Sequence, residues 1–324
     1  MAKSAVPAYL SLIIAAVGFG SIPVFSFYLS LLGVSSLQQA LFRAIFTVIF
    51  LFLGLGIAFS FRDIQFQRKH TPHFILYGLI GIALSIIAYI SAIAIGTPVV
   101  VAVSLTYLYP ALTLILSRIF LKELFTLPRL IAVPLSIVGA IIVSLPLTPE
   151  LEPVPVVGII LSFLNGVFAA CYMVLGRKWG GHEGYAPTVT TFWGYFFAML
   201  WMAPLFLIIS VLVPDPRIVG FQLVLPPVTW LLLVGFALFA TAIPYTLTNV
   251  GVERIDASAA SILLLLDPVS AVVFGFLFLS QGLAFWQAIG ASLILFATVL
   301  IAIEPRLQRQ KQSKLETPLQ PDSL

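Results

Sequence analysis

Residues 74–117 read FILYGLIGIALSIIAYISAIAIGTPVVVAVSLTYLYPALTLILS and contain no charged side chain. This stretch decides the class of protein, because an α-helix needs about 20 apolar residues to cross the roughly 30 Å hydrocarbon core of a bilayer. As one straight helix the stretch would measure about 66 Å, so the chain must fold back once within it. Gly96-Thr97-Pro98 is the expected turn, since glycine and proline interrupt helices. The stretch therefore predicts two antiparallel membrane spans.

The whole chain has the composition of a polytopic membrane protein. Of its 324 residues, 61% are hydrophobic and only 9% are charged, and the mean hydropathy is +1.14. Soluble domains carry about 25% charged residues, and a soluble globule could not bury this much apolar surface. The composition argues against a soluble enzyme and against a nucleic-acid binder. The single cysteine, Cys171, excludes an internal disulfide and a multi-cysteine metal cluster.

Continuously apolar runs recur along the chain and predict ten spans. The first of them, from Ser4, is expected to turn at Gly33-Val34-Ser35-Ser36. A β-barrel is excluded because the runs do not alternate between apolar and polar residues. The polar segment 304–324 is expected to be a disordered cytoplasmic tail, because it is poor in apolar residues and contains three prolines. The expected spans are residues 8–30, 37–60, 74–95, 98–117, 130–147, 155–176, 187–213, 228–250, 257–279 and 283–303.

The distribution of lysine and arginine predicts the orientation. With the N-terminus in the cytoplasm, the inner segments carry 14 of the 16 Lys and Arg residues, and the outer loops carry only Arg217. The last one, Arg43, lies inside the second span. Because cytoplasmic loops of membrane proteins are enriched in Lys and Arg, we expect a multi-pass protein of the cytoplasmic membrane with both termini inside.

The ten spans divide into two five-helix halves, residues 1–150 and 151–303, followed by the tail. Since five is odd, the second half must be inverted relative to the first. A shift of 158 residues superimposes Pro110 of span four on Pro268 of span nine. Inverted repeats are common in secondary transporters, whose solute site lies near mid-membrane between the halves. The predicted fold class is an all-α integral membrane protein with ten transmembrane helices in two inverted five-helix repeats.

Short motifs, in order along residues 8–303, resemble the drug/metabolite transporter (DMT) superfamily in its EamA-type ten-helix form. In two places the chain departs from the family pattern: Phe19 stands in place of a tryptophan, and the ninth span ends Leu279-Ser280-Gln281 where the family has Leu-Gly-Glu. The resemblance implies two five-helix repeats and transport of small metabolites, often amino acids, without naming the solute. The motifs are Gly18-Phe19-Gly20-Ser21, Phe42-Arg43, Tyr109-Pro110 with Phe120-Leu121-Lys122-Glu123, Phe168-Ala169 with Arg177-Lys178, and Asp267-Pro268.

Two charges inside spans are the leading candidate binding residues. A charge within a span costs at least about 2.5 kcal/mol, so it usually faces a cavity or a partner. Arg43 is expected about 9 Å below the outer edge and Asp267 about 15 Å above the inner one, which leaves about 6 Å between their depths in a core of roughly 30 Å. We therefore hypothesise an Arg43–Asp267 pair across a central cavity. The alternatives are a snorkelling arginine, a proton-carrying carboxyl, and a structural cap on a kinked helix.

The remaining candidates are polar or aromatic residues and helix breaks. Pro110 and Pro268 interrupt the helical hydrogen-bond ladder, either lining a cavity or only kinking the helix. Packing within the bundle is the alternative for each polar or aromatic candidate, and an interfacial aromatic belt is a further alternative for Trp193. Glu123 is expected to be a solvated charge at a helix end. The other substrate-binding candidates are Tyr89, Tyr109, Asn165, Trp193 and Asn249.

The motifs of several enzyme classes are absent from the sequence. It contains no His-Glu-x-x-His zinc motif and no phosphate-binding Gly-x-x-x-x-Gly-Lys-Ser/Thr loop. We expect no metal and no cofactor, and the expected partners are a small-molecule solute and the lipid bilayer. Small residues of span ten favour helix packing within the monomer or a homodimer equally. The predicted function is an alternating-access carrier of small metabolites such as amino acids, not an enzyme; a passive channel of the same fold is the alternative.

Overall fold

The computed structural model describes residues 6–58, 67–97, 99–143, 145, 155–181, 185–212, 215–280 and 285–316. Within these ranges the secondary structure is helical throughout, and nine helices are long and apolar enough to cross a membrane. A tenth apolar helix, α8 (Leu127–Val143), has 17 residues, which span about 26 Å and so nearly match the hydrocarbon core. The prediction of an all-helical protein with ten spans is confirmed.

Several spans consist of two to four helical segments. The first half contains α1 (Val6–Gly20), α2 (Ile22–Leu31), α3 (Ser36–Ala58), η1 (Arg68–His70), α4 (Thr71–Leu76), η2 (Tyr77–Ala83), α5 (Leu84–Ala94), α6 (Val99–Thr106), α7 (Tyr109–Phe120) and α8. The second half contains α9 (Val156–Leu175), η3 (Gly176–Gly181), α10 (Pro187–Leu212), α11 (Pro216–Val219), α12 (Pro227–Ala237), η4 (Leu238–Ala242), α13 (Ile243–Arg254), α14 (Ala257–Leu264), α15 (Asp267–Leu279) and α16 (Phe285–Glu316).

Glycines make the two turns that the sequence predicts within its longest apolar runs. Gly33 ends α2 and Gly96 follows α5, with φ angles of 78° and 88°. A positive φ at the end of a helix favours glycine, because glycine has no side chain to clash there. At the first turn the N–H of Val34 donates back to the carbonyl of Leu29 at 3.0 Å, which closes the helix end. Pro98, the third residue of the predicted second turn, lies outside the described residues.

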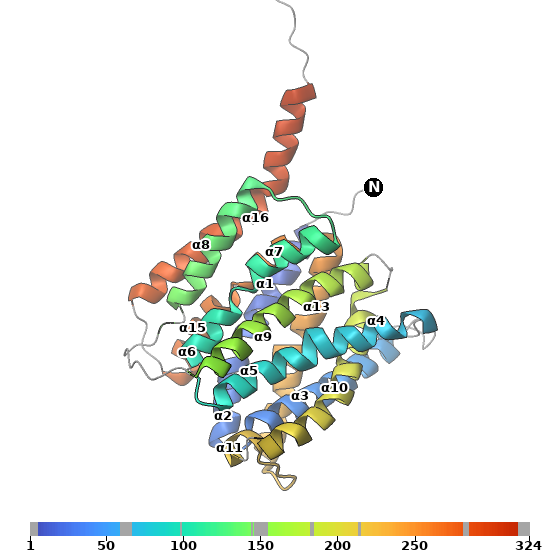
Figure 1. The fold of residues 1–324 in the computed structure, drawn as a ribbon, viewed down its shortest axis with the longest axis vertical. Helices are drawn as coiled ribbons and strands as arrows, with labels where there is room; N and C mark the ends of the chain where they lie inside the picture. Colours follow the sequence, from blue (N-terminus) through green and yellow to red (C-terminus); the bar gives the residue numbers. More distant parts are fainter. Residues whose placement is uncertain are drawn as a thin grey trace, which may run out of the picture.

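The two halves are interwoven rather than merely side by side (Figure 1). Helix α1 of the first half packs against α13, α14 and α15 of the second half. In return, α9 of the second half packs against α5, α6 and α7 of the first. Spans two and seven also pack on the opposite half: α3 of the first half contacts α12 of the second, and α10 of the second half contacts η2 of the first. Each half therefore supplies part of the other half's core.

Spans four and nine are broken near their middles at matching places. Helix α6 ends at Thr106 and α7 begins at Tyr109, while α14 ends at Leu264 and α15 begins at Asp267. The ends of the second pieces also match: Lys122 and Ser280, 158 residues apart, are the two non-glycine residues with a positive φ in the described chain, at 58° and 54°. This shared backbone detail supports the repeat that the sequence predicts.

Two predicted boundaries are wrong. Span three begins at Arg68 rather than at residue 74, and the last helix runs to Glu316, so a disordered tail from residue 304 is contradicted as far as residue 316. The physical reason is the same at both ends. A charged side chain marks the edge of the hydrocarbon core, but it does not end the backbone hydrogen-bond ladder, and Pro305 does not end the helix either. Residues 317–324 lie outside the described chain.

Helices α8 and α16, the fifth span of each half, pack on each other through glycines. A Cβ atom built on Gly139 would lie 2.7 Å from the carbonyl oxygen of Gly290, and one built on Gly290 would lie 2.6 Å from that of Gly139. Because backbone atoms form this contact, a flexible side chain cannot move aside. Small residues permit such close approach between membrane helices.

We expect Gly139→Ala to destabilise the protein by about 1–3 kcal/mol, since an added methyl group must separate two helices. The measurement is thermal unfolding in detergent. Gly54→Ala on α3 is the matched control, because no atom lies within 4 Å of a Cβ at that position. Equal melting temperatures for the two variants would contradict the assigned crossing.

Candidate functional site

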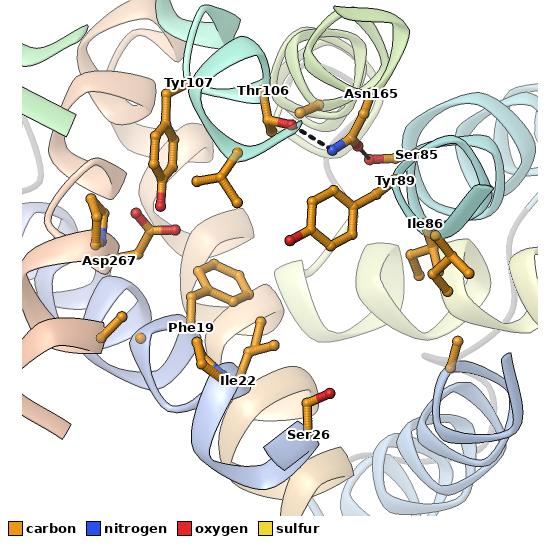
Figure 2. A pocket seen from close by; sticks show the side chains of 18 of the residues that line it. Phe19, Ile22, Ser26, Ser85, Ile86, Tyr89, Thr106, Tyr107, Asn165 and Asp267 are labelled. Atoms are coloured by element: carbon orange, nitrogen blue, oxygen red, sulfur yellow. Dashed lines mark hydrogen bonds between the residues drawn. The ribbon is translucent and has the colours of Figure 1, made fainter. Parts of the chain in front are cut away.

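A cavity of about 1090 Å³ lies between the two halves. The volume is at the upper end of small-molecule sites. Its lining comes from both halves and includes Phe19, Ser26, Tyr89, Asn165 and Asp267 (Figure 2). Apolar and aromatic side chains form most of the wall, and the charged and amide groups are few. This pattern suits one amphipathic solute with its waters.

The cavity reaches one face of the bundle. We call the face where α1 begins and where α16 leaves the bundle the terminal face, at the top of Figure 1. The cavity extends from mid-membrane toward the opposite face, where its lining includes Ser30, Ser36, Leu145, Ile218 and Gln287. Ser30, Ser36 and Leu145 are exposed. The structure is therefore open on the face opposite the termini.

Most of the site residues proposed from the sequence line this cavity. They come from spans two, three, four, six and nine, which lie far apart along the chain. Pro110, Trp193 and Asn249 are not among the lining residues. The candidates that do line it are Arg43, Tyr89, Tyr109, Asn165, Asp267 and Pro268.

The break in span nine presents Asp267 to the cavity. Asp267 is the first residue of α15, where the positive end of the helix dipole favours a carboxylate. The hydroxyl of Tyr107, in the matching break of span four, hydrogen-bonds the carboxyl group and points toward it in Figure 2. The other oxygen, Oδ1, is buried, and no residue of the described ranges donates a hydrogen bond to it. Such an atom is costly to bury unpaired.

The Gly18-Phe19-Gly20-Ser21 motif brings span one against the same break. A Cβ on Gly20 would lie 2.9 Å from the carbonyl oxygen of Asp267, and one on Gly18 would lie 2.9 Å from that of Phe239. Glycine at both positions lets α1 approach spans eight and nine this closely. Phe19, between the two glycines, is directed into the cavity, where its ring meets Tyr245 edge-on at 4.9 Å.

Arg43 is the second charge of the cavity wall. Its guanidinium carbon lies 5.1 Å from the ring centroid of Phe236, a distance at which a cation is attracted to the ring face. Its Nε is buried, and no described residue accepts a hydrogen bond from it. Within the described chain no ion pair joins Arg43 to Asp267, so the hypothesised pair is not formed in this conformation, although both residues line one cavity.

Tyr109 bonds the backbone of span nine, a role that the sequence did not predict. At the break the N–H of Leu265 donates to the carbonyl of Ile262 rather than to that of Ser261, so the Ser261 carbonyl loses its α-helical donor. The Tyr109 hydroxyl donates to this carbonyl at 2.9 Å. The residue at the start of α7 thus satisfies the broken backbone of span nine and ties the two breaks together.

Asn165 faces the cavity with its amide already engaged. Its Nδ2 donates to the Thr106 hydroxyl at 2.9 Å, and its Oδ1 accepts from the Ser85 hydroxyl at 2.6 Å (Figure 2). These bonds join spans three, four and six at the cavity wall. Asn165 therefore positions its neighbours in the cavity wall.

Two of the candidates lie elsewhere in the bundle. Asn249 is buried, accepts from the Tyr77 hydroxyl at 3.1 Å and donates to the Thr191 hydroxyl at 2.8 Å, which links spans three, seven and eight. Trp193 belongs to a ring cluster, with Phe192 and Phe196 at centroid distances of 5.0 and 5.3 Å. Composition could not separate these buried contacts from cavity-lining ones, because both need polar or aromatic side chains within a span.

A group of charges at the terminal face was not predicted as a unit. We name it the terminal-face ion cluster. Glu123, expected to be solvated, is only 7% exposed and belongs to this cluster, so that expectation is wrong. Acidic and basic residues at neighbouring span ends could have predicted the cluster. The Lys and Arg count used for the orientation treats each charge separately and so does not detect such pairs. The cluster consists of Glu123, Arg129, Arg177, Asp256 and Glu304.

Comparison with known proteins assigns the family. The sequence profile of the EamA-like transporter family matches residues 6–145 and again residues 156–303. The chain belongs to the EamA-like transporter family. An uncharacterised transporter of Archaeoglobus fulgidus is 30% identical over 228 residues, which cover 69% of this chain and 75% of that protein. The family resemblance inferred from the motifs is confirmed.

Two further similarities agree with this assignment. The uncharacterised transporter YyaM of Bacillus subtilis is 26% identical over 256 residues, covering 76% of this chain and 79% of that protein. A solved crystal structure superposes with a TM-score of 0.73 over 92% of this chain and 98% of the other, at 18% identity. The structural likeness supports the EamA fold, and the relatives support a multi-pass membrane transporter.

Tyr109→Phe is expected to lower the free energy of unfolding by about 1–3 kcal/mol, because it leaves the buried carbonyl of Ser261 without a donor. Thermal unfolding measures the effect. Tyr89→Phe removes the same atom from a tyrosine whose hydroxyl makes no hydrogen bond within the described chain, and it should leave the melting temperature unchanged. If both variants melted alike, the bracing role of Tyr109 would be refuted.

Proposed function

We propose that this protein is a secondary transporter, an alternating-access carrier of small amphipathic metabolites such as amino acids. The observation that carries the proposal is one cavity between inverted halves whose wall holds a carboxylate and a guanidinium. Each has a buried polar atom without a hydrogen-bond partner among the residues that the structure describes. A solute with an ammonium group and a carboxylate supplies both missing partners. Asp267 receives the ammonium, and Arg43 receives the carboxylate.

The apolar lining completes the match to such a solute. Phe19, Ile86 and Phe236 form part of the wall and suit a hydrocarbon or aromatic side chain, because they remove apolar surface from water. The hydroxyl of Tyr89 lies in the same wall and offers a donor or an acceptor. The proposed site therefore distinguishes zwitterions from ions of a single sign.

The one-sided opening supports a carrier over a channel. A channel in its conducting state needs a continuous polar path, whereas this cavity takes none of its lining from the terminal-face ion cluster. We place the two halves, residues 1–150 and 151–303, as the moving units. We also place the terminal face in the cytoplasm, in accord with the Lys and Arg distribution. The structure then represents the outward-open state of a cytoplasmic-membrane protein.

Counterflow in proteoliposomes tests the proposal. Vesicles are loaded with unlabelled amino acids, one at a time, and the entry of trace labelled solute is followed. A carrier is expected to give transient, saturable accumulation for one class of solute. Non-saturating equilibration would support a channel instead, and absence of flux for zwitterions but flux for solutes of a single charge would overturn the assigned site.

Asp267→Asn is expected to weaken the apparent affinity for an ammonium-bearing solute about thirtyfold or more, since loss of a buried charge partner costs about 2–5 kcal/mol. Counterflow with increasing solute measures this affinity. Asp215→Asn is the matched control, because it makes the same chemical change at an ion pair with Arg217 on the opposite face. An unchanged affinity in Asp267→Asn would remove the carboxylate from the site.

A further inference from the structure

The terminal-face ion cluster joins the two halves of the protein. Arg129 of the first half approaches two carboxylates of the second, with Nη2 at 2.5 Å from Asp256 and Nε at 3.1 Å from Glu304. Arg177 of the second half lies 3.4 Å from Glu123 of the first. Three ion pairs therefore cross the boundary that must open if the cavity is to reach the terminal face.

The cluster also completes the backbone of span nine. The Glu123 carboxylate accepts from the N–H of Ala257 at 2.7 Å and from the Ser258 hydroxyl at 2.6 Å. These groups lie at the start of α14, so a side chain of one half caps a helix of the other. Arg177 adds hydrogen bonds to the carbonyls of Val252 and Ile255. The charges and the start of α14 thus form one connected network of ion pairs and hydrogen bonds.

Burial makes these pairs different from ordinary surface ion pairs. The side chains of Arg129, Glu123 and Glu304 are only 7%, 5% and 4% exposed, whereas that of Asp256 is 33% exposed. Surface ion pairs contribute little to stability. Separating a buried pair is costly unless water enters to solvate both partners. Opening this face therefore requires the cluster to be hydrated.

The positions that the 158-residue repeat matches to the ion cluster on the opposite face are not charged. A shift of 158 residues matches Arg129 with Gln287, Glu123 with Gln281 and Glu304 with Pro146. All three matched positions hold uncharged residues. Gln287 lines the open cavity and donates to the carbonyl of Val143 at 3.5 Å. Two faces that inversion would make equivalent thus differ in the charges available to close them.

We propose that the terminal-face ion cluster is a latch, which holds the terminal side of the cavity shut and favours the conformation open to the opposite face when no solute is bound. Its cross-half ion pairs break each time the cavity turns to the terminal face. This inference rests on the proposed carrier function and adds the step that controls it. Weakening the latch shifts the empty protein toward opening at the terminal face.

Cysteine labelling in oriented membrane vesicles tests the latch without any solute. In a Cys171→Ala background, Ser261→Cys places a reporter in the fully buried layer between the cluster and the cavity, and Ser85→Cys places one in the cavity wall. A membrane-impermeant thiol reagent is added to one face at a time. With the latch intact, Ser85→Cys reacts from the opposite face and Ser261→Cys reacts slowly from both faces.

Asp256→Asn removes two ion pairs of the cluster while keeping the shape of the side chain. We expect the Ser261→Cys reporter to react about tenfold faster from the terminal face, within the usual range of conformational coupling, and the Ser85→Cys reporter to react more slowly from the opposite face. Asp256→Glu should restore the original pattern, and Asp215→Asn should leave it unchanged. Glu304→Gln is the second variant if Asp256→Asn does not fold.

The outcomes separate the latch from the carrier. Unchanged labelling in a protein that shows counterflow would overturn the latch and leave the carrier intact. Faster labelling of Ser261→Cys without slower labelling of Ser85→Cys would indicate loosened packing and would also overturn the latch. The expected shift in a protein that gives only non-saturating flux would keep the cluster as a gate and would refute the carrier.

Discussion

The structure depends on one constraint: within a bilayer, every buried polar group must find its partner inside the protein. Broken spans four and nine leave backbone carbonyls without helical donors, and the buried charges of the bundle need partners within the protein. The partners come from the other half of the chain. Tyr109 of span four bonds the freed carbonyl of Ser261, and Tyr107 bonds Asp267. The same breaks that form the cavity therefore hold the two halves together.

This mutual dependence explains why the cavity lies where it does. Two irregular segments meet at mid-membrane, and the space between them is lined by groups that an unbroken helix would not expose. Glycines at 18 and 20 let span one close one side of this space, and the amide of Asn165 braces another. Arg43 and Asp267, which face the cavity, each keep a buried polar atom without a hydrogen-bond partner among the described residues. In the proposed function, a bound solute supplies the partners that these two side chains lack.

Sequence reasoning predicted the fold well because the hydrophobic requirement of a span is local and additive. Composition, the Gly33 and Gly96 turns and the matched prolines each state a local rule, and together they gave ten spans and an inverted repeat. The depths of Arg43 and Asp267 made a pair across a cavity a hypothesis; both residues line one cavity, but within the described chain no ion pair joins them. The pairing of side chains could not be predicted in the same way, because it depends on which helices become neighbours. For this reason the sequence did not predict that Asn249 and Trp193 lie outside the cavity, or that Glu123 is buried in an ion cluster.

The central claim is that two interwoven halves move about the mid-membrane breaks and open the cavity to one face at a time. Distance distributions between spin labels in lipid test it most directly, with one pair at Leu145 and Arg217 on the open face and another at Leu124 and Arg254 on the terminal face. We predict that a transported solute shortens the first distance and lengthens the second. Solute flux with both distance distributions unchanged would contradict the account.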